Sequence, residues 1–157
     1  MAKTSFGKTN EGAEITKYTL KNAGGMEVDI LSLGAALRAI RVPDKDGKIR
    51  DVILGYDTPA DYQNVRGYLG MVIGRNGNRI KDAKVTIDGV TYELEANNNE
   101  NNLHSGSEGF HSVVWEEAEA DDTHVVFKHT SSDGAQGFPG RMQVTMTYTL
   151  TDAGEVV

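Results

Sequence analysis

Apolar and polar side chains alternate with a period of two residues along most of the chain. Met26, Val28 and Ile30 alternate with Glu27 and Asp29, which is typical of a strand with one buried face. The same alternation predicts further strands over residues 16–20, 35–42, 49–54, 112–117, 124–129 and 142–150. The pattern therefore predicts an all-β, antiparallel β-sandwich.

Turn and helix signals agree with this fold class. Asp88-Gly89 lies between alternating β-branched and aromatic residues over 84–94, and both residue types tolerate a positive φ, so the segment predicts a two-residue hairpin. Helical periodicity is nearly absent. It is confined to a single turn over residues 58–64, with Pro59 at its start.

The end of the chain predicts an incomplete hairpin. A strong strand pattern over 143–150 is followed by a turn over 151–154 and by a return arm of only Glu155, Val156 and Val157. A short arm leaves backbone groups unpaired and one edge exposed. We therefore expect the fold to continue beyond Val157, with a complementary C-terminal chain or self-association at the exposed edge. A frayed end is the alternative.

Composition excludes several classes of function. The 157 residues suit one domain or part of one. Sixteen Lys and Arg against 23 Asp and Glu give a net charge of −7, which argues against nucleic acid or an anionic membrane as partner. The absence of Cys excludes disulfides, thiolate nucleophiles and zinc knuckles. The sequence has neither a run of about 20 apolar residues nor an apolar signal segment at its start, so we expect a cytoplasmic protein.

Two polar clusters contain the candidate chemistry. Residues 74–80 place two Arg and two Asn among Gly, directly after the apolar run 69–73, and such donors suit a polyhydroxylated or anionic ligand. Residues 97–106 are rich in Asn and include His104, which can exchange a proton near neutral pH. The alternative interpretations are a solvated turn for the first cluster and a loop with local hydrogen bonds for the second.

The remaining aromatic and imidazole side chains have structural interpretations. His124 and His129 fall on opposite faces of one predicted strand, so they should be surface residues that do not share a metal ion. His111 is expected to face solvent, and Trp115 is expected in the core.

With these clusters, the chain resembles the N-terminal part of an aldose 1-epimerase, a member of the galactose mutarotase family. The order of the matching stretches and the 25-residue interval from Arg79 to His104 both fit the family. The stretches are residues 33–35, 51–56, 74–80, 102–106 with 109–110 and Trp115, and 137–140 before the strand that ends at 147–150.

The resemblance implies an isomerase. Family members interconvert the α and β anomers of free aldoses such as galactose and glucose, with no cofactor and no metal ion, and their fold is a β-supersandwich. Residues 1–157 would be the N-terminal part of a single such domain. Arg79 and His104 match active-site positions and Asn78 matches a neighbouring sugar-contacting position, so these three should bind the monosaccharide substrate through hydrogen bonds. His104 could also share in acid catalysis.

The resemblance places the other catalytic groups outside this chain. The principal acid is a second His in an Asn-His-Ser-Tyr-type motif, and a Glu base and a sugar-binding Asp lie further on, so we expect the 157 residues alone to be inactive. Ser105-Gly106 also departs from the usual Gly-Gly. The alternatives are a sugar-binding β-sandwich without catalysis, an interaction protein that pairs through its last strand, and a sugar-phosphate epimerase relative using Arg75.

Overall fold

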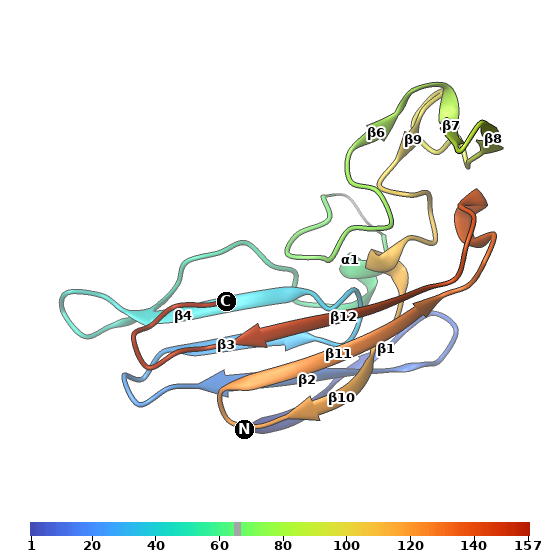
Figure 1. Ribbon diagram of the computed structural model, residues 1–157. Coiled ribbons are helices and arrows are strands. Elements are labelled where there is room, and N and C mark those ends of the chain that lie inside the picture. The colour runs from blue at the N-terminus through green and yellow to red at the C-terminus, as the bar shows by residue number, and fades with distance from the viewer. Residues whose placement is uncertain (65–66) are drawn as a thin grey trace.

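Two antiparallel β-sheets make up most of the molecule (Figure 1). The computed structural model describes residues 1–64 and 67–157. The larger sheet has the order β1-β2-β3-β4-β5, formed by Ala2–Lys8, Glu14–Lys21, Glu27–Leu31, Leu37–Pro43 and Ile49–Asp51. The smaller sheet has the order β10-β11-β12, formed by Glu116–Ala120, His124–Ser131 and Met142–Thr149.

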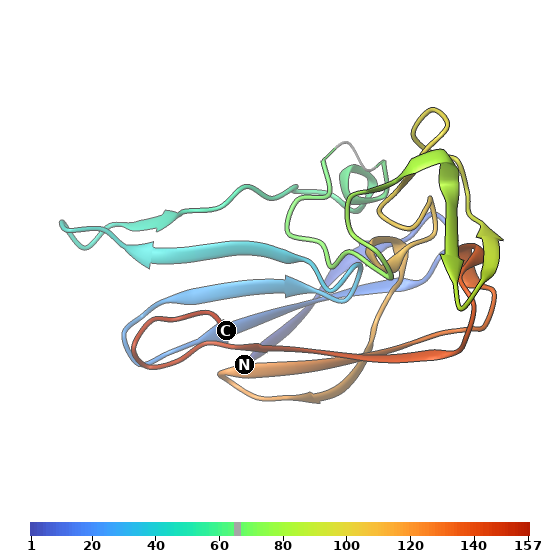
Figure 2. The ribbon, with the colours of Figure 1, turned by 45° about the horizontal axis from the view of Figure 1, so that its top comes forward.

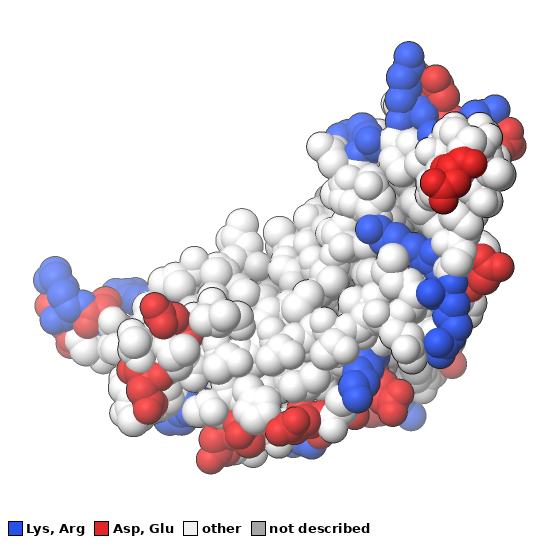
Figure 3. Space-filling model, viewed as in Figure 1, with Lys and Arg blue, Asp and Glu red and all other residues white. Residues whose placement is uncertain are grey.

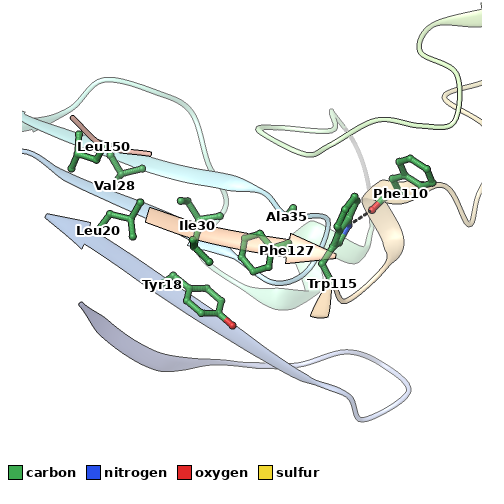
Figure 4. Close-up of a cluster of buried hydrophobic side chains, with 10 residues drawn as sticks. Tyr18, Leu20, Val28, Ile30, Ala35, Phe110, Trp115, Phe127 and Leu150 are labelled. Carbon is green, nitrogen blue, oxygen red and sulfur yellow. Dashed lines mark hydrogen bonds between the residues drawn. The ribbon is translucent and has the colours of Figure 1, made fainter. Parts of the chain in front are cut away.

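The two sheets pack as layers, seen almost edge-on in Figure 2. Their alternating apolar side chains meet in one core, where the rings of Tyr18 and Phe127 lie edge to face with centroids 5.2 Å apart (Figure 4). The other buried members of this cluster are Leu20, Val28, Ile30, Ala35, Phe110, Trp115, Val125 and Leu150. The predicted antiparallel sandwich is confirmed.

Trp115 anchors one end of this core, as expected. Its side chain is only 2% exposed, and its indole N–H donates a hydrogen bond of 3.0 Å to the carbonyl of Phe110 (Figure 4). The strand predicted over 112–117 is wrong at its start, because residues 110–112 form a 3₁₀ turn and β10 begins only at Glu116. This turn places Phe110 edge-on against Trp115, with ring centroids 5.7 Å apart.

The hairpin and the helical turn are confirmed. Asp88 and Gly89 have φ of 50° and 81° between β7 and β8, formed by Lys84–Ile87 and Val90–Glu93. The only α-helix of the described residues, α1 over Pro59–Gln63, begins after Thr58, whose hydroxyl accepts a hydrogen bond of 3.2 Å from the Asp61 N–H. None of the helices in residues 1–64 and 67–157 has the length and apolar character needed to cross a bilayer.

The return arm at the end of the chain is ordered. Thr149 and Val157 exchange two backbone hydrogen bonds of 2.8 and 2.9 Å, and Leu150 pairs with Val156. The arm covers only the end of β12. Among the residues that the structure describes, Met142–Tyr148 of this strand pair with β11 alone. Association of this edge with another chain stays a prediction.

Beside the sandwich stands a short ladder that carries the candidate site. Its strands are β6 and β9, Arg79–Ile80 and Asn102–Leu103, at the top right of Figure 1. Two further 3₁₀ turns, Lys81–Ala83 and Ala135–Gly137, flank the hairpin and β12. Figure 3 shows the face below the ladder as hollowed, with Lys, Arg, Asp and Glu side chains mostly at its rim.

Candidate functional site

The two polar clusters, far apart in sequence, meet in the β6–β9 ladder. Arg79 pairs with Leu103, and Ile80 pairs with Asn102, in antiparallel register. Backbone pairing therefore places Asn78 and Arg79 beside His104, so the structure brings together all three predicted site residues.

Two hydrogen bonds join Asn78 and His104, one of them to the imidazole ring. The backbone N–H of Asn78 donates to Nδ1 of His104 at 3.0 Å, and the N–H of His104 donates to the carbonyl of Asn78 at 2.9 Å. Both residues have left-handed backbone, with φ of 60° and 53°. Asn adopts this conformation readily, but it costs His of the order of 1 kcal/mol, so the surrounding contacts must hold it.

The contact with Asn78 selects the tautomer of His104. A backbone N–H can only donate, so Nδ1 accepts and the proton of the neutral ring sits on Nε2. Burial, and then the nearby positive charge of Arg79, lower the pKa of His104 below its ordinary value of 6.5. The imidazole is therefore built to present one N–H donor and to stay neutral near pH 7.

We expect an NMR titration of the His104 ring to have its midpoint below 6.5. Because the pKa is lowered by folding, the neutral ring stabilises the fold at pH above the ordinary value. That contribution is lost as the pH falls through the pKa of the folded state. A midpoint at or above the ordinary value would contradict the geometry described here.

Arg79 is exposed but held from two sides. Its Nε donates to Oδ1 of Asn98 at 2.9 Å, and its Nη1 donates to Oδ1 of Asn78 at 3.1 Å. Within the described part of the chain, Nη2 has no protein acceptor. Since a guanidinium has five N–H donors, the side chain is oriented by the loop and still offers donors to a hydroxyl or an anion.

Ser105, where the family resemblance leads us to expect Gly, joins the two loops. Its hydroxyl accepts a hydrogen bond of 2.7 Å from the N–H of Asn76 and donates one of 3.1 Å to the carbonyl of the same residue. The Ser105 side chain is fully buried. The departure from the family pattern therefore supplies a tie between residues 74–80 and 102–106.

Ser105→Ala should destabilise the protein by about 1–2 kcal/mol, because both backbone groups of Asn76 would lose a buried partner. The free energy of unfolding in urea measures this loss. Ser132→Ala is the matched control, because Ser132 is exposed and its hydroxyl makes no hydrogen bond with a described residue. Equal losses in the two variants would show that the tie contributes nothing.

Two imidazoles lie deeper than the sequence predicts. His111, expected in solvent, is 2% exposed because the 3₁₀ turn at 110–112 points it inward, and burial lowers its pKa. His129, expected at the surface, packs against the rings of Phe110 and Trp115, each 5.4 Å away. Both histidines line a cavity of about 610 Å³. Asn78, Arg79 and His104 are not among the residues that line this cavity.

Arg75 is not available to a ligand. Its guanidinium donates to Oγ of Ser131 at 2.9 Å, and to the carbonyls of Ser132 at 2.6 Å and Pro139 at 2.8 Å. Arg75 therefore ties the loop 74–80 to the end of β11. The sequence-based interpretation of this residue as a phosphate contact is not supported.

Tyr68 contacts the candidate site, and the sequence did not point to it. Its ring lies edge to face with His104, with centroids 4.6 Å apart. The residue falls in an irregular segment between Gly67 and Gly70, with φ of 52°, where no periodicity shows which way a side chain points. The two flanking glycines are the only local signal of an unusual backbone.

Comparison with known proteins gives one consistent family. The family model described as aldose 1-epimerase matches residues 16–157. The chain is 39% identical over 146 residues to the aldose 1-epimerase of Escherichia coli (strain K12), covering 93% of this chain and 42% of that protein. It is 38% identical over 158 residues to the galactose mutarotase of Rattus norvegicus, covering 100% of this chain and 45% of that protein.

A solved structure agrees with these matches. The GalM/aldose epimerase homologue from C. elegans superposes with a TM-score of 0.85 at 31% identity, covering 89% of this chain and 43% of that one. The chain thus spans less than half the length of each of these relatives. The family match over residues 16–157, the identities and the shared fold lead to one conclusion: this chain belongs to the aldose 1-epimerase family.

Proposed function

We propose that Asn78, Arg79 and His104 form the sugar-binding part of an aldose 1-epimerase that interconverts the anomers of a free aldose such as galactose or glucose. The observation that carries the proposal is the pairing of Asn78 with His104 beside Arg79, in a chain of this family. Three polar side chains held in fixed positions by hydrogen bonds suit a ligand with many hydroxyl groups.

In the proposed reaction, a carboxylate takes the proton of the C1 hydroxyl while an imidazolium protonates the ring oxygen. The ring opens, C1 turns about the C1–C2 bond, and the ring closes on the other face. The resemblance assigns the principal acid and the base to a second His and a Glu outside these 157 residues.

His104 is then proposed as a hydrogen-bond donor. The Asn78 N–H occupies Nδ1, so protonating this nitrogen would break that bond, while Nε2–H remains free to donate to a sugar oxygen. Arg79 stays charged and binds hydroxyl or ring oxygens through its N–H groups. We also keep as proposals a cytoplasmic location and residues 1–157 as part of a single mutarotase-type domain.

Free sugars are favoured over sugar phosphates. The guanidinium of Arg75 is already bound by Ser131, Ser132 and Pro139, so it offers nothing to a phosphate at the end of the sugar. The second candidate function is a sugar-binding module without catalysis, which the same three side chains would also serve.

Polarimetry of freshly dissolved α-galactose tests the proposal. The longest reading frame that carries these 157 residues should accelerate mutarotation above the rate in buffer. Saturable galactose binding without acceleration would favour the binding module. If the protein neither binds galactose nor accelerates mutarotation, the proposed function is overturned.

A further inference from the structure

The Tyr68 ring contacts two imidazoles beside the candidate site. It lies edge to face with His104, with centroids 4.6 Å apart and planes at 68°. It also contacts His111, at 4.9 Å and 84°. Both contacts are edge to face, the arrangement that aromatic pairs prefer.

His111 is the buried member of this group of rings. His111 is 2% exposed and follows Phe110, whose N–H donates to the carbonyl of Gly74 at 3.1 Å. Tyr68 itself has left-handed backbone, with φ of 52°, so the chain accepts strain to place this ring. Such strain persists only where surrounding contacts determine the conformation.

The ring of His104 needs such support. A half-turn about its Cβ–Cγ bond would exchange Nδ1 with a carbon, which cannot accept the N–H of Asn78. The 3.0 Å contact to Asn78 favours one orientation but does not by itself stop the ring from swinging away from the loop. A flat neighbour packed against the imidazole restricts that movement.

We propose that Tyr68 is a positioning residue, which packs against both His104 and the buried His111 and holds the imidazole of His104 in one orientation, with Nε2–H as the donor offered to the sugar. Tyr68 acts through His104, and its ring matters more than its hydroxyl. The orientation of His104 is independent of the proposed function, and only the consequence for sugar binding rests on that function.

The charges near His104 do not account for a fixed ring. Arg79 lies on β6, and Glu95 reaches the same loop through the Ser107 N–H, which donates to its Oε2 at 2.6 Å. Burial lowers the pKa of His111, which favours a neutral imidazole against Tyr68. Besides the bond from Asn78, the contact with the Tyr68 ring therefore restrains the His104 ring.

The test compares Tyr68→Leu with Tyr68→Phe in the 157-residue chain labelled with ¹⁵N at histidine. Long-range ¹H–¹⁵N spectra should show His104 as a single Nε2–H tautomer in the native chain and in Tyr68→Phe, which keeps the ring. In Tyr68→Leu they should show a mixture of tautomers. A single tautomer in Tyr68→Leu, or an equal mixture in Tyr68→Phe, would overturn the proposal.

A second variant covers a failure of Tyr68→Leu to fold, which near-ultraviolet circular dichroism of Trp115 would reveal. His111→Leu removes the second ring against which Tyr68 packs, so it should also mix the tautomers of His104. An unchanged single tautomer in His111→Leu would overturn the proposal in that case.

Galactose affinity separates this inference from the proposed function. Tyr68→Leu should weaken binding about threefold to tenfold, and Tyr68→Phe by less than about twofold, in line with the loss of one aromatic pair. Mixed tautomers in a chain that does not bind galactose would leave the positioning role intact and remove the proposed function. If Tyr68→Leu leaves the His104 tautomer unchanged in a chain that binds galactose, the proposed function stays and the positioning role of Tyr68 is overturned.

Discussion

Arg79→Ala should lower kcat/KM for mutarotation about 10- to 100-fold, because it removes charged hydrogen bonds worth about 1.5–3 kcal/mol to a bound sugar. The kcat/KM of Arg79→Lys should lie between those of Arg79→Ala and the native protein. An ammonium group keeps the positive charge but lacks the planar guanidinium N–H groups that Asn98 and Asn78 orient. Polarimetry at several galactose concentrations measures both variants in the reading frame that carries these residues.

Arg50→Ala is the matched control for this experiment. Arg50 is an exposed arginine on β5 that pairs with Asp44 at 3.1 Å, outside the β6–β9 ladder. The control should leave kcat/KM within about twofold, and all three variants should unfold within about 0.5 kcal/mol of the native protein. An unchanged kcat/KM in Arg79→Ala would remove this residue from the site.

Asp29→Ala should destabilise the protein by about 3 kcal/mol, because it removes the anion around which three cations gather. Asp29 is 1% exposed and accepts hydrogen bonds of 2.8 and 2.9 Å from Arg41. Lys17 and Arg38 each place a nitrogen 3.6 Å from its carboxylate. Without the carboxylate, these cations repel one another on the outer face of the larger sheet. Urea unfolding followed by tryptophan fluorescence measures the loss.

The same residue predicts how stability depends on pH. Burial by itself raises the pKa of Asp29, but hydrogen bonds from Arg41 and Thr19 and attraction to the cations outweigh it, so the pKa is lowered. The stabilisation is therefore present above the ordinary value of 3.8 and is lost as the pH falls below it. Asp29→Ala should lose this part of the acid sensitivity.

Glu27→Ala is the control, because Glu27 also bonds to Arg41, at 3.2 Å, but is only half-buried. Glu27→Ala should lower the free energy of unfolding by less than about 1 kcal/mol. Losses of equal size for Asp29→Ala and Glu27→Ala would show that burial of the carboxylate does not matter.

Local patterns in the sequence predicted most of the strands. Val28 and Ile30 alternate with polar residues because one face of β3 covers the core, and Asp88-Gly89 identifies its hairpin through backbone conformation alone. The first strand, β1, was missed because it is an edge strand with mostly exposed side chains, so no alternation records it. Strands that are consecutive in sequence pair in both main sheets, whereas the pairing of β6 with β9 joins strands that are not consecutive, and alternation does not encode it.

The site was predicted in part. Asn78, Arg79 and His104 were found through family resemblance, and pairing of β6 with β9 brings them together. The support beneath them was not found. Tyr68 and His111 lie in irregular segments. There the direction of a side chain depends on tertiary contacts and cannot be predicted from the periodicity of apolar residues. Local sequence therefore identified groups that offer donors but missed the packing that orients them.

An NMR titration of the 157-residue chain with galactose tests most directly whether Arg79 and His104 bind a sugar together. We predict saturable shifts of the Arg79 Nε–H and the His104 Nε2–H with one common dissociation constant. In Arg79→Ala, we predict that galactose no longer shifts the His104 signal, while His104 keeps the same tautomer. Shifts elsewhere in the chain with both of these signals unmoved, or different dissociation constants for the two groups, would contradict the account.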